Sequence, residues 1–322
     1  MIMGEFKEIF KKVDGWGKLK EFARAHVLCF ALVETAILGV SRKSLEIVRL
    51  AVQNKVYQRL KKKNAILIQN FVREHPVQYK QEHRRTIWTI WLQGIENAPE
   101  IVRQCYASMQ EHLGDREIVV ITEDNYSDYV TFPNYIMDKY KEGVISKVHF
   151  ADLLRIELLT KYGGTWLDGT VFCSGLVEDK HDFYLDSDLF LYQSLKPGLD
   201  GHATAISSWL ITSSANQNIM LLTRELLHNY WKTHKYAVDY FILHNFFQMA
   251  IEAYPDEWKK VVPISNSIPH ILLLRLFDQY DARVWESVKF LSPFHKLSYK
   301  YDKEKENIES TYYKNVIKVH NN

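Results

Sequence analysis

Cysteine is scarce in this chain of 322 residues, which contains only three. Cys29, Cys105 and Cys173 are far apart and odd in number. This pattern is typical neither of a disulfide framework nor of a structural zinc site. We therefore expect a protein of a reducing compartment, for which the cytosol is the simplest choice.

Long apolar runs are also missing. The longest run covers residues 27–40 and contains Glu34, whereas a membrane-spanning helix needs about 20 apolar residues. The segment before it is amphipathic, and no small-residue cleavage site stands out. The sequence therefore predicts neither a transmembrane segment nor a signal peptide.

Proline is absent before Pro76, and the first part of the chain has a helical pattern. Apolar residues recur at steps of three and four over residues 6–71, which predicts two or three helices with breaks near residues 14–17 and 39–41. Residues 76–85 are polar and are interpreted as a linker. We thus expect an α-helical module over residues 1–80 and a second domain over residues 81–322.

Charge is divided unevenly along the chain. Residues 1–85 hold 18 Lys and Arg against 8 Asp and Glu, or +10, which leaves 23 against 31, or −8, for the rest. The basic module is predicted to contact an anionic membrane surface. Packing on the main domain or on a second subunit is an equally good explanation. No nucleic-acid partner is expected, because the basic residues are spread around the helices and not grouped with aromatics that stack on bases.

After residue 85 strands and helices alternate, which predicts an α/β domain with a mainly parallel sheet. The expected strands are residues 86–92, 117–121, 165–168, 189–192 and 207–211. The expected helices are residues 99–113, 133–142, one capped by Ser146 that ends at Gly163 and Gly164, one capped by Asn216 that reaches about Trp231, and residues 239–252. The tail from Pro293 onward is predicted to be irregular.

Asp168 is the residue at which we expect the chemistry. It ends a short apolar strand, and ligands of open α/β sheets bind at the carboxyl ends of the strands. One helix earlier, Asp152 and Arg155 are three residues apart and can project toward the same region. An ordinary ion pair on a helix surface is the alternative explanation for that pair.

A family resemblance favours the functional interpretation. Asp152 and Arg155, then Tyr162-Gly163-Gly164, then Trp166-Leu167-Asp168 resemble the Asp-x-x-Arg helix, Tyr-Gly-Gly turn and aromatic-x-Asp strand of the family 32 glycosyltransferases, in particular the capsular polysaccharide synthesis protein branch. The stretch at residues 87–94, IWTIWLQG, is similar to the first strand of that family. The resemblance is good over residues 86–175, weak to about residue 298 and negligible before residue 86.

The resemblance implies a GT-A domain, with a Rossmann-like mixed sheet and flanking helices, that transfers a sugar from a nucleotide donor with retention of configuration. It also implies a divalent ion, Mn²⁺ or Mg²⁺, which stabilises the diphosphate leaving group. Asp168 would support this metal and be catalytic, while Trp91 would stack on the uracil, although a core aromatic is the alternative for this residue. The donor-binding residues implied are Trp91, Gln93, Asp152, Arg155, Gly164 and Asp168.

One position departs from the family pattern. The family strand leads into Asp-x-Asp, but this chain has Asp168-Gly169-Thr170, so a hydroxyl replaces the second carboxylate. Either a late residue completes a metal site with Asp168 and Thr170, for which His295 and His320 are the candidates, or the dependence on metal is reduced.

The acceptor side has weaker signals. Tyr240 and His244 lie among aromatic residues in a composition that suits sugar binding, and Asp239 beside them is a candidate nucleophile. We expect transfer of galactose or glucose from a UDP donor to a lipid-linked intermediate of bacterial capsule or exopolysaccharide, at the inner face of the cell membrane. A protein acceptor, a UDP-sugar-binding module without transfer activity, and a homo-oligomer stay open.

Overall fold

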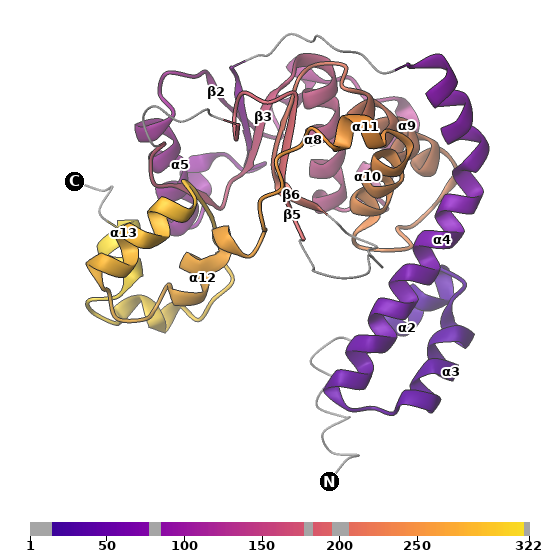
Figure 1. Cartoon of the computed structure of the whole chain (residues 1–322), viewed down its shortest axis with the longest axis horizontal. Helices are drawn as coiled ribbons and strands as arrows, with labels where there is room; N and C mark the ends of the chain where they lie inside the picture. The colour runs from indigo at the N-terminus through magenta and orange to yellow at the C-terminus, as the bar shows by residue number, and fades with distance from the viewer. Residues whose placement is uncertain (1–14, 77–84, 177–182, 195–205, 319–322) are drawn as a thin grey trace.

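The computed structural model describes residues 15–76, 85–176, 183–194 and 206–318 (Figure 1). The first described range forms three helices, α2 (Gly15–Arg24), α3 (Leu28–Leu38) and α4 (Arg42–Glu74). The break expected at residues 39–41 is present, because the Ser41 side chain caps α4 by accepting a hydrogen bond from the Ser44 amide at 3.1 Å. A second break separates α2 from α3 and contains His26, whose φ is 56°. The predicted helix start at residue 6 lies outside the described residues.

A five-stranded sheet forms the centre of the described main domain, in the order β2-β1-β3-β6-β5. Strands β2, β1 and β3 are parallel, whereas β6 is antiparallel to both β3 and β5. Four of the five strands therefore point the same way, and the expected mixed, mainly parallel α/β fold is confirmed. The strands are β1 (Ile87–Ile90), β2 (Ile118–Ile121), β3 (Gly164–Asp168), β5 (Leu189–Gln193) and β6 (Ile206–Ser213).

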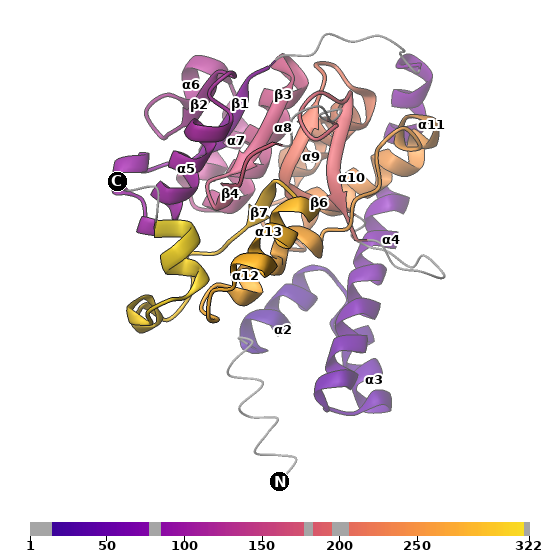
Figure 2. The same cartoon turned by 60° about the vertical axis from the view of Figure 1, so that its left-hand side comes forward.

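Both faces of this sheet are covered (Figure 2). Trp166 of β3 packs into the larger apolar core with three helices, and the next residue, Leu167, packs into a second core on the other face, because side chains alternate along a strand. The larger core contains residues of α8 (Lys147–Tyr162), α9 (Asn218–Thr233) and α10 (Ile242–Ala253). The opposite core contains residues of α5 (Glu100–His112), β4 (Val171–Cys173) and β7 (Phe294–Lys296).

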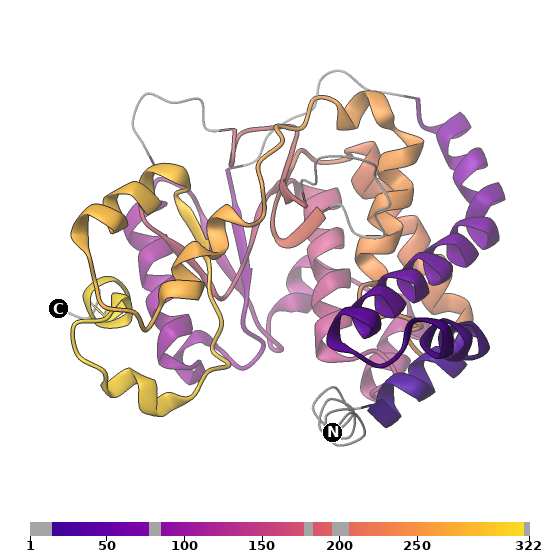
Figure 3. The ribbon, with the colours of Figure 1, turned by 60° about the horizontal axis from the view of Figure 1, so that its bottom comes forward.

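Shorter elements complete the domain. The C-terminal ones lie beside α5, on the side of the sheet away from α4 (Figure 3). They are η2 (Ile268–His270), α12 (Ile271–Arg275), α13 (Ala282–Leu291), η3 (Lys303–Asn307) and η4 (Tyr313–Ile317). Of these, α12, α13 and η4 share a third apolar cluster with α5. The others are η1 (Ile95–Asn97), α6 (Tyr126–Tyr129), α7 (Asn134–Lys141) and α11 (Pro255–Trp258).

Two local expectations are wrong. Helix α9 is capped by Gln217, whose side chain accepts a hydrogen bond from the Met220 amide at 3.1 Å, while Asn216 has a φ of 58° and stands outside the helix. The tail after Pro293 begins with strand β7, which pairs antiparallel with β4. A strand of three residues is too short to show a period in the sequence.

Helix α4 packs along the side of the main domain and shares its larger core. Its buried stripe includes Val52 and Val56, which belong to the same apolar cluster as residues of α9 and α10. The Tyr57 hydroxyl donates to Glu252 of α10 at 2.6 Å, and the Tyr254 hydroxyl donates to the His75 carbonyl at 2.9 Å. The division into two domains stays a prediction. In the described part of the chain, no helix combines the length and apolar character needed to cross a bilayer.

Candidate active site

Asp168 lies at the carboxyl end of β3, where it pairs in register with Ile90 at the end of β1. The chain turns at Gly169 and Thr170 and enters β4. This turn is close to β1, since a Cβ on Gly169 would lie 3.1 Å from the Ile90 carbonyl oxygen. The carboxylate therefore stands at the edge of the sheet where α/β proteins bind ligands.

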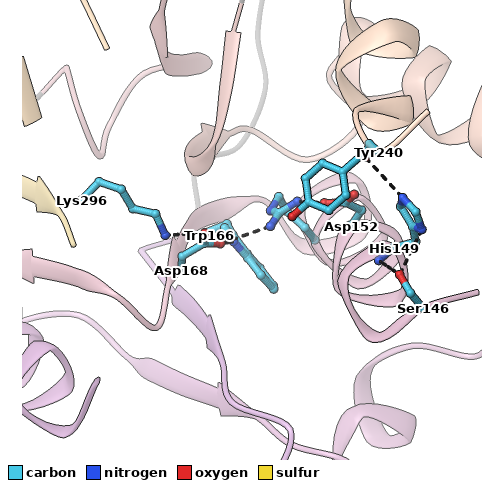
Figure 4. A network of polar contacts seen from close by, with 8 residues as sticks. Ser146, His149, Asp152, Trp166, Asp168, Tyr240 and Lys296 are labelled. Atoms are coloured by element: carbon cyan, nitrogen blue, oxygen red, sulfur yellow. Dashed lines mark hydrogen bonds and ion pairs between the residues drawn. The ribbon is translucent and has the colours of Figure 1, made fainter. Parts of the chain in front are cut away.

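Three donors hold the Asp168 carboxylate (Figure 4). Its Oδ1 accepts hydrogen bonds from Trp166 Nε1 at 2.9 Å and from Arg155 Nη2 at 3.2 Å, and its Oδ2 accepts one from Lys296 Nζ at 2.8 Å. Burial alone raises the pKa of the Asp168 carboxyl, but the Lys296 and Arg155 charges outweigh burial and hold this pKa below its ordinary value. The carboxylate is thus ionised and fixed in orientation.

Arg155 joins the two acidic residues. One of its terminal nitrogens donates to Asp152 and the other to Asp168. Its guanidinium carbon lies 4.7 Å from the centroid of a Trp166 ring, a cation–π contact. Burial raises the pKa of Asp152, against the lowering effect of Arg155. The pair is buried, so it is not the surface ion pair that the sequence left open. Arg155 is also committed to carboxylates, so it positions them in this structure.

Lys296 is the residue of this network that the sequence did not reveal. It ends β7, and its ammonium donates to Asp168 Oδ2 at 2.8 Å and to Thr170 Oγ1 at 2.6 Å. β7 pairs with β4, so residues 126 and 128 positions apart in the sequence meet at the site. A lysine in an aromatic segment carries little signal by itself. Its position two residues after Phe294, on one face of a short strand, was the available clue.

The residues around Asp168 do not fit a divalent cation. Both carboxylate oxygens accept hydrogen bonds from cationic or N–H donors, and Thr170 accepts from the Lys296 ammonium. A divalent cation placed there would face the positive charges of Arg155 and Lys296 at close range. Among the described residues, no group of three or more His, Cys, Asp or Glu could hold a metal. A divalent metal stays a prediction, and the donor set argues against it.

His295 is not a ligand candidate in this geometry. Its side chain is fully buried between Phe172 and Trp285, and its Nε2 lies 2.9 Å from Ser174 Oγ. Lys296, the next residue, reaches Asp168, because side chains alternate along β7. Burial lowers the pKa of His295 to about 3. The other candidate, His320, lies outside the described residues.

Two predicted donor residues follow β1. Trp91 is half-buried and makes an edge contact with Tyr299 at 5.6 Å between ring centroids, and a Cβ on Gly169 would lie 3.4 Å from its ring. The Trp91 side chain is therefore beside the Asp168 turn. Gln93 is exposed and lines a different hollow of about 500 Å³, together with Thr122 and other residues of the β2 edge.

Gly164 is at the wrong end of β3 for a donor contact. Four residue steps along the strand, about 13 Å at the usual rise, separate it from Asp168. It has a φ of 98°, and a Cβ there would lie 2.4 Å from the Thr86 carbonyl oxygen. The structure thus corrects its predicted role: glycine is required for the close packing of β3 against the chain before β1.

Tyr240 and His244 lie on the α10 side of the site. The Tyr240 ring is exposed, and its backbone carbonyl lies 3.3 Å from His149 Nε2 of α8. Its ring lies beside Asp152 (Figure 4), and the pKa of the Tyr240 hydroxyl is raised by partial burial and by the Asp152 and Asp168 charges. The His244 pKa is lowered to about 4 by burial and by Arg155. Tyr240 therefore borders the network (Figure 4), whereas the printed ring contact of His244 is with Phe241 at 5.2 Å between centroids.

Asp239 has a structural position. Its Oδ1 accepts a hydrogen bond from the Phe241 amide at 2.9 Å, and its Oδ2 accepts one from Asn245 Nδ2 at 3.2 Å. The side chain is buried, and both oxygens are used to shape the turn into α10. This arrangement does not support its predicted role as a nucleophile.

Fold and site together define an α/β protein with a carboxylate network at the carboxyl end of its central strands, the edge where proteins of this class bind ligands. The family model for capsular polysaccharide synthesis protein matches residues 40–316. The chain therefore belongs to this family, and the resemblance inferred from its motifs is confirmed. The match begins in the turn between α3 and α4, so it includes α4 as well as the α/β domain.

Glycosyltransferases are among the similar proteins. The chain is 25% identical over 158 residues to O-glycosyltransferase PaGT of Phomopsis amygdali, covering 44% of this chain and 37% of that protein. It is 30% identical over 104 residues to O-glycosyltransferase braB of Annulohypoxylon truncatum, covering 30% and 25% respectively. The chain thus spans about a third or less of these relatives. A solved structure, PaToxG Glycosyltransferase, aligns with 65% of this chain and 79% of its own at 16% identity, with a TM-score of 0.36, too low to define a shared fold.

Proposed function

We propose that this protein is a retaining glycosyltransferase of GT-A type that moves galactose or glucose from a UDP donor to a lipid-linked intermediate of capsule or exopolysaccharide. The observation that carries the proposal is the Asp168 network at the carboxyl end of β3 in a member of the capsular polysaccharide synthesis protein family. The O-glycosyltransferases among its relatives support the same reaction class.

The proposal gives the residues of the network different tasks. Asp168 is the more accessible carboxylate, with a side chain 28% exposed against 11% for Asp152. It can therefore accept hydrogen bonds from the hydroxyls of the donor sugar. Asp152 is the more buried carboxylate and is held by Arg155. Arg155 donates to both carboxylates, which orients them, and its charge acts to lower the pKa of each. Trp91, next to the turn, offers a flat apolar face for the uracil.

The test measures release of UDP and transfer of sugar by the purified protein with a panel of UDP-sugars. We expect turnover with UDP-galactose or UDP-glucose and a loss of about 100-fold in Asp168→Asn, because preorganised electrostatic contacts contribute that much to catalysis. Asp256→Asn, which changes an exposed carboxylate on α11, should keep the parent rate. If the parent turns over no sugar, and Asp168→Asn binds UDP as well as the parent does, the enzyme proposal fails.

The acceptor is tested in the same assay. Membrane extract that contains lipid-linked saccharides is the first acceptor, and a delipidated protein extract is the second. Label in the lipid fraction supports the proposal. Label confined to protein would establish the alternative of a protein acceptor. Binding of UDP-sugar with no transfer to either would establish a binding module.

We also propose that the N-terminal helices hold the protein on the inner face of an anionic membrane. Helices α2 and α3 lie at the end of α4 that is remote from the sheet (Figure 1). The tip formed by α3 and the start of α4 carries exposed apolar side chains, among which Ile37 of α3 is 73% exposed. The other exposed apolar residues of this tip are Leu32, Val33 and Leu38 of α3 and Ile47 and Leu50 of α4.

Basic residues lie next to this apolar tip. Arg42 and Lys43 begin α4 directly after the α3 connection, and Arg49 follows two turns later. An apolar face flanked by cations is typical of a helix pair that lies in the interface of an anionic bilayer. This supports peripheral binding to the membrane where a lipid-linked acceptor would be found.

A further inference from the structure

Lys296 is the most unexpected member of the site. Its side chain is only 19% exposed, and it lies on strand β7, which forms a two-stranded sheet with β4. Two of the three N–H donors of an ammonium are used, one by Asp168 and one by Thr170. No described residue takes the third donor, so it is available to a ligand.

The charges of the network are balanced without any added ion. Asp152 and Asp168 contribute two negative charges, while Arg155 and Lys296 contribute two positive ones. Thr170 adds a neutral oxygen that accepts from the ammonium. The Lys296 ammonium thus occupies the position beside Asp168 from which a cation could act on a phosphate.

We propose that the Lys296 ammonium, oriented by Asp168 and Thr170, binds the diphosphate of the donor and stabilises the leaving group, so that transfer needs no divalent metal at Asp168. The proposal rests on the proposed function, because it concerns the donor of that reaction. It assigns to Lys296 a direct contact with the substrate.

The transfer reaction breaks one bond at the anomeric carbon of the donor sugar and forms another. The bond between the anomeric carbon and the diphosphate oxygen breaks, and its electron pair stays on that oxygen. The acceptor oxygen forms the new bond to the anomeric carbon, and its proton goes to the departing diphosphate. Lys296 keeps its own protons and donates a hydrogen bond to the oxygen on which negative charge develops.

Binding of UDP, measured by calorimetry in buffer with EDTA, tests the inference apart from turnover. We expect the parent to bind UDP, and added Mn²⁺ to change the affinity by less than about threefold. Lys296→Met should weaken UDP binding by about 10-fold or more, since a hydrogen bond to a charged group contributes that much. Lys296→Arg should restore most of it. Lys289→Met, which removes a surface lysine of α13 paired with Glu286, should bind as the parent does.

Two further readouts make the outcome decisive. Manganese titration followed by electron paramagnetic resonance should detect no tight Mn²⁺ site in the parent, and thermal melting checks that each variant is folded. UDP binding that requires Mn²⁺, or a folded Lys296→Met that binds UDP like the parent in EDTA, overturns the inference while leaving the proposed reaction standing. Failure of the parent to bind UDP with or without Mn²⁺ overturns the proposed donor, and this inference with it.

Discussion

Arg155 and Trp166 donate to the same oxygen of Asp168, at 3.2 Å and 2.9 Å, while the guanidinium carbon of Arg155 lies 4.7 Å from the centroid of a Trp166 ring. The indole thus contacts the arginine with its face and the carboxylate with its N–H. A single side chain thereby fixes the relative position of the cation and the anion. Trp166 itself is fully buried in the larger core. The packing of that core therefore holds the indole, and with it the site, in place.

The first prediction concerns the coupling of Arg155 to its carboxylates. Arg155→Met leaves the buried Asp152 without its cationic partner, while Lys296 still pairs with Asp168, and we expect the free energy of unfolding to fall by about 3 kcal/mol. Adding Asp152→Asn removes the charge of that carboxylate, so the double variant should be less destabilised than the sum of the single variants. Urea unfolding of all four proteins measures this coupling. Additive losses would contradict a buried network.

The second prediction separates a structural glycine from a donor contact. Gly164→Ala puts a Cβ 2.4 Å from a backbone oxygen at a φ of 98°, and we expect a loss of more than about 2 kcal/mol of stability. Gly143→Ala is the matched control, because it has a φ of 73° but nothing within 4 Å. It should cost only about 1 kcal/mol. Equal costs at the two sites in urea unfolding would contradict the steric explanation.

The sequence predicted the parts of the site that lie on long, regular elements. Asp152 and Arg155 on one helix and Asp168 at the end of an apolar strand came together as their periodicity indicated. Lys296 could not be predicted, because its strand is three residues long and its partner strand is equally short. Which late residue reaches Asp168 depends on the pairing of Phe172 with His295, and such a long-range register leaves no local pattern. His295, one of the two late candidates that the sequence offered, is the neighbour of Lys296, and a shift of one residue in a strand reverses the face.

The third prediction uses the buried imidazole of His295. Burial lowers its pKa to about 3 in the folded protein, against about 6.5 in an unfolded chain. Neutral His295 therefore supports the folded state above pH 6.5, and this support is lost as the pH falls from about 6.5 toward 3. The loss is on the order of 4 kcal/mol over that range. His295→Gln cannot titrate, so its free energy of unfolding should decline less steeply below pH 6 than that of the parent. Parallel curves would contradict the shift.

The fourth prediction tests the role of Asp239 in catalysis. Its oxygens accept from the Phe241 amide and from Asn245, and an asparagine can still accept one of these hydrogen bonds while losing the charge of a nucleophile. We expect Asp239→Asn to keep kcat within about threefold, since only a positioning contact is weakened. Single-turnover transfer measures the chemical step. A fall of 100-fold or more in a variant that melts like the parent would assign the nucleophile to Asp239.

The last prediction concerns the apolar tip formed by α3 and the start of α4. Leu32→Ser combined with Ile37→Ser should lower binding to phosphatidylglycerol vesicles by about 30-fold or more, because each such side chain contributes about 1.5 to 3 kcal/mol when buried. Leu274→Ser is the control, since Leu274 is 80% exposed but lies on α12, far from the tip in the chain.

Arg42→Gln with Lys43→Gln should weaken binding to these vesicles and leave binding to phosphatidylcholine vesicles unchanged, because only the anionic surface attracts the two cations. Vesicle sedimentation gives these numbers, and size exclusion of the parent shows whether a second copy covers the tip. A parent that sediments with neither vesicle and elutes as a dimer, with the Leu32 and Ile37 changes restoring the monomer, would assign the tip to self-association.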